Sequence, residues 1–595
     1  MGKYDPIWNL DSLYPGGSRS PEFARLLDAC DSSIQEMDRL LAGLPDEPGP
    51  EWVKAIQDLQ DLSARLWDAV GFVECLEAQD VSDALAGQLM SRVRKMNARR
   101  AMLLTRLESR FLGASDGAWK QMLARPELAD VSFVLNELRE IARVKMAPEK
   151  ELLAEELSVD GYHAWGRMYE RIAGGLRVEF EEKGKKLPLS MGQVHNRLEN
   201  PDRGVRKQAF EKLESAWGRV ADLTAVALNS QAGYRLGLYK NRGWDSVLAE
   251  PLRINRMRRE TLEAMWGVVA EESARLVPYM KEKARLIGIE RLAWYDLAAP
   301  VGGAERRFTY DQAADFILEQ FGRFSEELGG FARNAFEKRW IEAEDRPGKR
   351  AGGFCTDFPI EGETRIFMTF GGTFGGVSTL GHELGHAYHS WLVKDFPYWA
   401  TQYPMTLAET ASTFSEMLVS DAALEAASSD GEKLSLLGIQ ADDAVTMMMN
   451  LRARFLFETS FFEARRGKSL TVEELNGEMR KAQETAYCGA LDPDGYHPVF
   501  WASKLHFYIT TTPFYNFPYV FGYLFSSGIY DRALKEGPSF AKKYAALLRE
   551  TGSTTCEDLA RKHLGVDLGR PEFWKSAVDR AVGRADRFVA LARGM

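Results

Sequence analysis

Two histidines and a glutamate at helical spacing form the clearest chemical feature of this sequence. His382, Glu383 and His386 fit the pattern HExxH within residues 377–393, whose composition favours a helix. Residues i and i+4 lie about one turn apart on one face of an α-helix, so both imidazoles can reach the same ion. Zinc accepts such a pair of ligands. Glu383 lies about 100° around the helix from His382, where a general base can reach a zinc-bound water.

A catalytic zinc ion usually has a third protein ligand and one open position. The pattern HExxHxxGxxH would supply a third histidine, but His389 and Leu392 stand where it requires glycine and histidine. A glutamate from a following helix is the alternative. The next strong helical segment, 406–417, offers Glu409 and Glu416, which are seven residues apart and therefore share one face. Spacing alone leaves both glutamates open as the third ligand.

A histidine and several tyrosines gather in the late segment 506–523. Hydrolysis of an amide builds negative charge on the carbonyl oxygen, and one well-placed O–H or N–H donor lowers that barrier by roughly 3–4 kcal/mol. Phenols and imidazoles are suitable donors, although a buried aromatic helix explains any single tyrosine equally well. The residues that could act in this way are His506, Tyr508, Tyr515, Tyr519 and Tyr523.

Helical periodicity dominates the elements that must position these residues. In the stretch 21–41 apolar residues recur at i, i+3 and i+4, and Ser20 is placed as the N-cap. The stretch 261–288 repeats the design, with Thr261 as its cap and Pro278 as the place for a kink. The sequence therefore predicts one helix in each stretch.

Two shorter stretches alternate like strands. Residues 176–180 do so before a charged turn, and we predict a boundary there between a helical N-terminal domain, 1–175, and a catalytic domain, 176–595. An exposed hairpin within a single domain is the alternative. Residues 365–370 form the second stretch, and the glycine-rich run 371–376 leads from it into the zinc helix. An exposed strand edge beside that helix could hold an extended peptide by backbone pairing.

Composition and charge exclude several classes of protein. The net charge is −10 and no basic cluster stands out, which argues against a nucleic-acid partner. No apolar run approaches the roughly 20 residues that a membrane span requires, and the first twenty residues hold no apolar signal-peptide core. The five cysteines form no CxxC pair, as is typical of reduced thiols. We therefore expect a cytoplasmic protein with no membrane partner.

The residues at 382–389, the helix with Glu409 and Glu416, and the segment 506–523 resemble the oligoendopeptidase F and thimet oligopeptidase family of zinc metallopeptidases. The resemblance implies that Glu409 is the third zinc ligand and that Glu416 orients a ligand. One departure is Gly376, which stands six positions before the first zinc histidine, where many relatives carry an acidic residue. The resemblance also implies transition-state contacts for His506, Tyr519 and Tyr523 and a substrate contact for Tyr515.

The same resemblance implies a mainly α, multi-helix fold with a small β-sheet beside the active site and a deep substrate channel. The implied activity is that of a metalloendopeptidase with one catalytic Zn²⁺, which hydrolyses internal bonds of short peptides. Zinc would polarise the scissile carbonyl and lower the pKa of its bound water. Glu383 would accept that water's proton and deliver it to the leaving amine.

Two other functions are compatible with the same helix. A zinc carboxypeptidase would recognise the terminal carboxylate of its substrate with a basic residue. A non-catalytic peptide-binding protein could keep the metal scaffold, but it would not need Glu383, which is dispensable for binding metal. An aminopeptidase of the HExxH type is disfavoured because the chain has no GxMxN motif.

Overall fold

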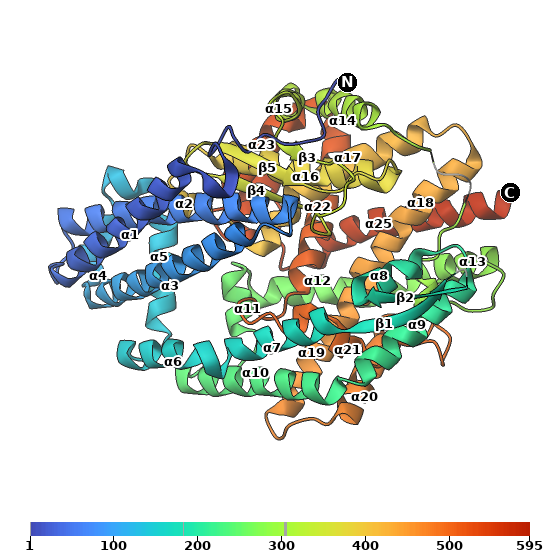
Figure 1. Cartoon of the computed structure of the whole chain (residues 1–595), viewed down its shortest axis with the longest axis horizontal. Coiled ribbons are helices and arrows are strands. Elements are labelled where there is room, and N and C mark those ends of the chain that lie inside the picture. The colour runs from blue at the N-terminus through green and yellow to red at the C-terminus, as the bar shows by residue number, and fades with distance from the viewer. Residues whose placement is uncertain (1, 183, 303–305) are drawn as a thin grey trace. The chain divides into compact units, whose positions relative to one another are not determined.

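The computed structural model describes residues 2–182, 184–302 and 306–595. Helices make up most of it (Figure 1), and the described strands form one two-stranded hairpin and one three-stranded sheet. The prediction of a mainly α fold with a small sheet is confirmed, whereas the predicted deep channel stays a prediction. Among the described residues, no helix is long and apolar enough to cross a membrane.

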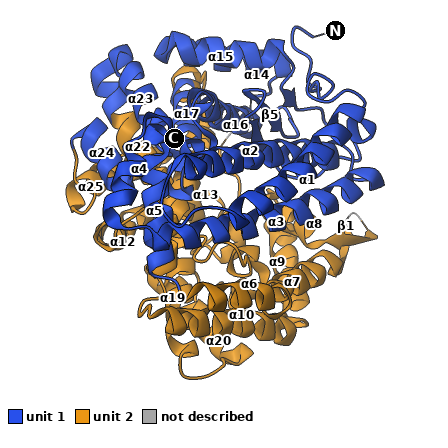
Figure 2. Ribbon diagram, turned by 90° about the vertical axis from the view of Figure 1, so that its left-hand side faces the viewer, with its two compact units in different colours: residues 1–145, 306–422, 532–565 blue, residues 146–305, 423–531, 566–595 orange. Residues whose placement is uncertain are grey.

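The chain forms two compact units, which Figure 2 shows in different colours. Unit 1 consists of Met1–Lys145, Arg306–Ala422 and Arg532–Gly565. Unit 2 consists of Met146–Glu305, Ala423–Asp531 and Val566–Met595. Each unit is therefore assembled from three separate stretches of sequence. The predicted division into 1–175 and 176–595 stays a prediction.

Three long helices open unit 1, and the first begins as predicted. They are α1 (Pro21–Ala42), α2 (Pro50–Gln79) and α3 (Ala84–Gly113). The Ser20 hydroxyl accepts a hydrogen bond from the backbone N–H of Phe23 at 3.3 Å, which confirms the predicted N-cap. Buried apolar side chains of all three helices share one core with Phe358 and Phe367 of the sheet. These helices therefore support the sheet as well as each other.

The three-stranded sheet lies next to the helix that carries HExxH. Its strands are β3 (Ile341–Glu342), β4 (Phe354–Phe358) and β5 (Glu363–Phe367), in the order β3-β5-β4. β4 runs antiparallel to β5 with Phe354 opposite Phe367, and β3 is parallel to β5. The strand predicted at 365–370 is thus the central strand of the sheet, so its expected role as an exposed edge is wrong. β4 is an edge strand instead.

The glycine-rich run after β5 leads into α16 (Phe374–Val393), which begins three residues earlier than the predicted stretch. Gly372 adopts a positive φ of 71°, and its carbonyl accepts a hydrogen bond from Phe308 N at 3.0 Å. The Thr373 hydroxyl caps the helix by accepting a hydrogen bond from Gly376 N at 3.2 Å. The chain therefore passes directly from the sheet into the motif helix.

The helix predicted over 261–288 is divided in the structure, so that prediction is wrong. It consists of α12 (Arg259–Glu272), a 3-10 helix (Ser273–Leu276) and α13 (Val277–Leu286). Thr261 is buried inside α12 and does not cap it. Pro278 lies in the first turn of α13. A proline is tolerated there because its missing N–H would have no partner within the helix.

The strand predicted at 176–180 is confirmed as part of the hairpin in unit 2. β1 (Arg177–Glu182) pairs antiparallel with β2 (Lys185–Ser190). The predicted charged turn is shorter than expected because Glu181 pairs with Lys186 across the two strands. Lys183, at the centre of that turn, lies outside the described residues.

The remaining helices complete the two units. In unit 1 they are α4 (Asp116–Leu123), α5 (Ser132–Arg143), α14 (Tyr310–Phe324), α15 (Glu326–Glu337), α23 (Phe540–Arg549) and α24 (Cys556–Leu564). In unit 2 they are α6 (Pro148–Gly161), α7 (His163–Gly175), α8 (Met191–His195), α9 (Arg203–Gly218), α10 (Ala221–Arg242), α11 (Ala249–Ile254), α18 (Asp430–Val445), α19 (Leu451–Arg465), α20 (Val472–Ala486), α21 (Phe500–Ser503) and α25 (Pro571–Gly594). Two further helices, α17 (Met405–Ala426) and α22 (Phe517–Glu536), contain points where the chain passes between units.

Candidate active site

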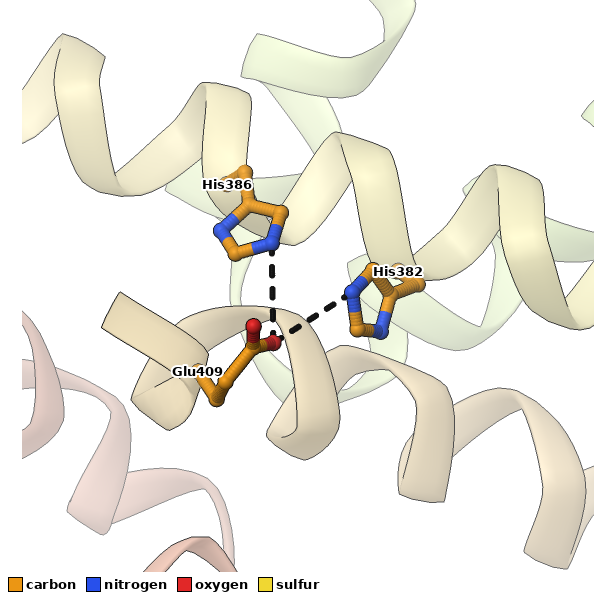
Figure 3. Close-up of side chains that lie close together, drawn as sticks. All are labelled: His382, His386 and Glu409. Atoms are coloured by element: carbon orange, nitrogen blue, oxygen red, sulfur yellow. Dashed lines mark ion pairs between the residues drawn. The ribbon is translucent and has the colours of Figure 1, made fainter. Parts of the chain in front are cut away.

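Two helices of unit 1 bring His382, His386 and Glu409 together (Figure 3). Both histidines lie on α16 and the glutamate on α17. The Glu409 Oε2 atom is 3.4 Å from His382 Nε2 and 3.6 Å from His386 Nε2. One donor atom from each residue lies within 4.8 Å of the others, and all three side chains are partly buried. This spacing suits one metal ion bound by three protein ligands.

Gly385 lets the two helices approach each other at this point. A Cβ atom on Gly385 would lie 2.5 Å from the Ala411 carbonyl oxygen and 2.7 Å from Ser412 Cα, both in the backbone of α17. Any larger residue would push α17 away and carry Glu409 with it. This role of Gly385 was not predicted from the sequence, although a glycine inside a helical pattern is a signal of close packing.

The structure separates the two glutamates that spacing could not. Glu409 faces both imidazoles, whereas Glu416 Oε2 lies 3.2 Å from Nδ1 of His382. The Ser378 hydroxyl donates to Glu416 Oε1 at 3.1 Å and so fixes that carboxylate. A carboxylate on one ring nitrogen keeps the proton there and leaves the other nitrogen free to act as a ligand.

No acidic side chain is needed at position 376 to orient His382. A Cβ atom at that position would lie 3.1 Å from the ring of Phe370, so the glycine is packed tightly against it. His382 receives its carboxylate partner from Glu416 on α17. The departure at Gly376 thus leaves His382 with an ordered partner.

Burial and charge give the site unusual proton affinities. Burial raises the pKa of Glu383 to about 7 and lowers that of His386 to about 4. Burial would also lower the pKa of His382, but its hydrogen bond with Glu416 and the nearby carboxylates outweigh it and raise that pKa to about 9. The nearby carboxylates therefore favour positive charge at His382, whereas His386 stays neutral and keeps the free nitrogen lone pair that a metal ligand requires.

His389 lies apart from these ligands and packs in the interior of unit 1. Its Nε2 atom is 2.8 Å from the Thr551 hydroxyl, and its ring stacks on Tyr403 at 4.0 Å. These contacts are those of a packing residue.

Three of the predicted aromatic residues gather in unit 2. The ring of His506 stacks on Tyr515 with centroids 5.4 Å apart and meets Tyr519 edge-on at 6.1 Å. Tyr515 and Tyr519 lie 5.1 Å apart. Tyr523 lies one turn after Tyr519 on α22 and is buried. The remaining candidate, Tyr508, is also buried and stacks on Tyr169 at 3.7 Å.

A buried glutamate, which was not predicted from the sequence, holds the backbone on either side of Tyr515. Glu458 Oε1 accepts a hydrogen bond from Phe514 N at 3.1 Å, and Oε2 accepts one from the Asn516 side chain at 2.6 Å. Phe514 has a φ of 55°, which is strained for a residue with a side chain. Glu458 therefore fixes a strained loop on both sides of Tyr515. The only sequence signal was a single carboxylate inside the aromatic stretch of α19.

Comparison with known proteins decides the family. Residues 197–579 match a family model described as Peptidase family M3. The chain belongs to peptidase family M3. The matched range includes the HExxH helix, Glu409 and the aromatic cluster, and residues 111–177 match a second model, described as Oligopeptidase F. The resemblance stated from the sequence is thereby confirmed, and so is the prediction that this M3 protein is a metalloendopeptidase.

Two relatives named as oligopeptidases and one solved structure are similar to this chain over most of its length. Group B oligopeptidase PepB of Streptococcus agalactiae is 24% identical over 526 residues, which cover 87% of this chain and 86% of that protein. Oligopeptidase PepF of Bacillus subtilis is 23% identical over 587 residues, which cover 96% of this chain and 85% of that protein. The crystal structure of oligoendopeptidase-F from Enterococcus faecium superposes with a TM-score of 0.73 at 20% identity, covering 96% of this chain and 99% of the other. The M3 protein thus shares the fold of that structure.

Proposed function

We propose that this protein is a zinc-dependent endopeptidase that hydrolyses internal bonds of short peptides. The observation that carries the proposal is the Glu409 carboxylate between the imidazoles of His382 and His386, next to the buried carboxyl of Glu383. Membership of peptidase family M3 and relatives named as oligopeptidases support peptides as the substrate class.

His382, His386 and Glu409 would hold the zinc ion through Nε2, Nε2 and a carboxylate oxygen. Two imidazoles and one carboxylate form a ligand set that zinc prefers, and a fourth position would remain for water or substrate. A zinc ion held there supplies Lewis-acid chemistry, which polarises a carbonyl and lowers the pKa of a water molecule. Glu416 would keep His382 in the tautomer that presents Nε2.

Glu383 would act as the general base. Its pKa of about 7 means that the carboxylate is available near neutral pH and that the acid form can also return a proton. It would accept a proton from the attacking water and deliver it to the leaving amine. Glu383 itself would not bind the metal. Its place on the same helix as His382 and His386 puts its carboxyl beside the site.

The aromatic cluster would supply donors to the developing oxyanion. His506, Tyr519 and Tyr523 are proposed for this role, and Tyr515 is proposed as a substrate contact. Burial, together with the charges of Arg454 and Lys504, lowers the pKa of His506 to about 4, so the imidazole is neutral and can donate from one nitrogen. Its Nδ1 atom is buried and has no hydrogen-bond partner among the described residues.

Substitution Glu383→Gln tests the proposal. The variant is expected to retain one zinc ion per chain and to lose cleavage of an internally quenched peptide by about 100-fold or more, because an amide cannot accept the proton. Glu425→Gln, an exposed change on α17, is the matched control and is expected to cleave like the wild type. Full zinc content with full cleavage in Glu383→Gln would refute the assigned base.

Peptides with blocked termini separate the endopeptidase from the two alternatives. An endopeptidase cuts an internal bond of a peptide that is acetylated at one end and amidated at the other. A carboxypeptidase leaves that peptide intact and removes residues only from a free C-terminus. A non-catalytic protein binds both peptides and cuts neither.

Two further features belong to the proposal. A deep channel would restrict substrates to short peptides, so the rate should fall as unfolded substrates lengthen, and a folded protein should resist cleavage.

A cytoplasmic location is supported by the five cysteines, which form no disulfide in the structure, and fractionation of cells tests it.

A further inference from the structure

Two positive charges lie against one aromatic ring in unit 2. The Arg454 guanidinium carbon, on α19, is 5.4 Å from the ring centroid of Phe500, and Lys504 Nζ is 5.1 Å from the same centroid. We call Arg454 and Lys504 the Phe500 cation pair. Arg454 is buried, and its Nε donates a hydrogen bond to the Asn450 side chain at 2.8 Å. Within residues 2–182, 184–302 and 306–595, neither cation has a carboxylate at ion-pairing distance.

Cations without a carboxylate are unusual at this depth. Removing a charge from water is unfavourable unless an opposite charge compensates, and two like charges add to that cost. Burial lowers the pKa of Lys504 to about 7, with Arg454 as a second cause, and lowers that of Arg454 to about 10. Two other buried cations of unit 2 do have carboxylate partners, in the pairs Arg206–Asp296 at 2.9 Å and Lys283–Asp442 at 2.7 Å. The half-buried Arg242 pairs with Glu151 at 2.6 Å.

Open space lies next to the ammonium group. Phe500 and Lys504 line a cavity of about 210 Å³ within unit 2. Its wall is largely aromatic and includes Phe210, Trp217 and Trp294. A ligand with one negative charge and an apolar group would therefore find both a counter-charge and a surface that water wets poorly.

The Phe500 cation pair is also close to the aromatic cluster proposed for catalysis. Both charges contribute to the lowered pKa of His506, which follows Lys504 by two residues. Arg454 also interacts electrostatically with Tyr519. The pair and the cluster are therefore neighbours within unit 2, so that one peptide can contact both.

We propose that the Phe500 cation pair binds a carboxylate of the peptide substrate, namely its C-terminal carboxylate, and that the adjoining cavity receives the apolar side chain of the last residue. Every unmodified peptide carries this group, and binding it would compensate the buried charge of Arg454 and favour the protonated form of the half-buried Lys504. The inference rests on the proposed peptidase function, because it assigns the part of the substrate that the enzyme recognises. The acidic side chain of an aspartate or glutamate is the other source of the same chemistry.

Three peptides with one common scissile bond test this inference. The first ends in a free carboxylate after an apolar residue, the second ends in the amide of that residue, and the third is an amide with glutamate as its last residue. The wild type is expected to cut all three at the same bond, with a KM about 10-fold lower for the free acid than for either amide and with similar kcat. Equal KM values for all three would overturn the inference, and a low KM for the glutamate amide would overturn the C-terminal assignment.

The variants Lys504→Met and Arg454→Gln are expected to remove the difference in KM between the free acid and the amides, because they raise KM for the free acid alone. Arg452→Gln, two residues earlier and on the opposite side of α19, removes a half-buried charge as a matched control and should keep the difference. Because acid and amide are compared in one preparation, partial loss of folded protein leaves the ratio unchanged. A ratio that persists in both variants would overturn the assignment to these two residues.

Direct binding separates failure of this inference from failure of the proposed function. Fluorescent forms of the acid and amide peptides are titrated with the full-length Glu383→Gln protein. Tighter binding of the acid, abolished by Lys504→Met in the same background, supports the carboxylate site even if no cleavage is ever detected. Equal binding of acid and amide overturns the site even if the wild type is an active peptidase.

Discussion

At the scale of single residues, Glu416 is a carboxylate that lies outside the proposed ligand set and contacts one of its histidines. It contacts the far nitrogen of His382 and is itself held by Ser378. Partners of this kind fix the tautomer and orientation of a ligating imidazole. Without Glu416, His382 could rotate or present the wrong nitrogen.

We therefore predict that Glu416→Ala lowers the affinity for zinc by about 10-fold to 100-fold. Competition with a chromophoric chelator measures that affinity without reference to activity. Glu425→Ala removes an exposed carboxylate from the same helix and should leave it unchanged. Equal affinities in the two variants would show that Glu416 does not position His382.

Asp68 on α2 gives a second prediction, which concerns stability and pH. Burial raises the pKa of this carboxyl to about 8, and its Oδ2 atom has no hydrogen-bond partner among the described residues. An unfolded aspartate titrates near 3.9, so between these values the folded state holds a proton that the unfolded state has lost. Stability therefore falls as pH rises from about 4 to about 8, by up to about 1.4 kcal/mol per pH unit.

The substitution Asp68→Asn should remove this loss of stability at higher pH, because an amide does not titrate. The melting temperature of the variant is expected to exceed that of the wild type at pH 8, by a margin that shrinks toward pH 5. Asp61→Asn, an exposed change on the same helix, should show little effect at either pH. A margin that stays constant with pH would exclude titration of Asp68 as its cause.

The predictable part of the site is the part encoded by spacing along one helix. His382, Glu383 and His386 needed only helical geometry. Glu409 and Glu416 could not be separated in this way, because residues seven apart share a face and only the crossing of α16 and α17 distinguishes them. Arg454 and Lys504 gave no sequence signal, because the lack of a nearby carboxylate among the described residues is visible only in the structure. Glu458 gave only a weak signal, because the backbone that it holds lies 56 residues later in the chain.

At the scale of elements, the approach of α16 to α17 depends on one glycine. We predict that Gly385→Ala weakens zinc binding and lowers the melting temperature, because the new methyl group would lie 2.5 Å from a backbone oxygen that cannot move alone. A loss of at least about 1–3 kcal/mol in the free energy of unfolding is expected. Calorimetry with and without zinc measures both effects.

Gly375→Ala on the same helix is the control. Its Cβ atom would lie 3.6 Å from the Thr373 hydroxyl, which is an ordinary contact. This variant should be as stable as the wild type or slightly more so, since alanine favours a helix more than glycine does. Similar behaviour of the two variants would contradict the role given to Gly385.

The elements themselves were predictable where local signals agreed. The helix after Ser20 and the strand before the charged turn follow their patterns closely. The stretch 261–288 broke into two helices because Pro278 starts a new one, a choice between kink and break that periodicity does not decide. The order of the sheet could not be predicted, because β3 joins β5 through a parallel pairing that no local pattern encodes.

At the scale of the whole molecule, metal binding should stabilise unit 1. The proposed ligands come from two helices, so an ion that binds only the folded state adds about 2.7 kcal/mol when present at 100 times its dissociation constant. We predict that a strong chelator lowers the temperature of a thermal transition and that added zinc restores it. Glu409→Gln protein should show a much smaller response to either treatment, and an identical response would contradict the proposed ligand set.

The division of the chain into two units lay beyond prediction from sequence. Hydropathy and periodicity describe neighbours along the chain, whereas each unit joins stretches separated by more than a hundred residues. The core that α1–α3 share with Phe358 and Phe367 is an example, because no sequence pattern in either segment indicates that the two pack together.

Because each unit is built from separate stretches of the chain, unit 1 cannot finish folding until its last stretch has been synthesised. The ring of Phe414 on α17 stacks on Tyr544 at 4.2 Å, and His389 on α16 lies at hydrogen-bond distance from Thr551, so the last stretch of unit 1 packs directly on the helices that carry the proposed metal ligands. A ribosome adding about 5–20 residues per second takes on the order of ten seconds to reach residue 551 after it has made the HExxH motif. The nascent chain must carry unfinished apolar surfaces through that interval. We expect zinc to be acquired after release from the ribosome, with chaperones covering the helices until then.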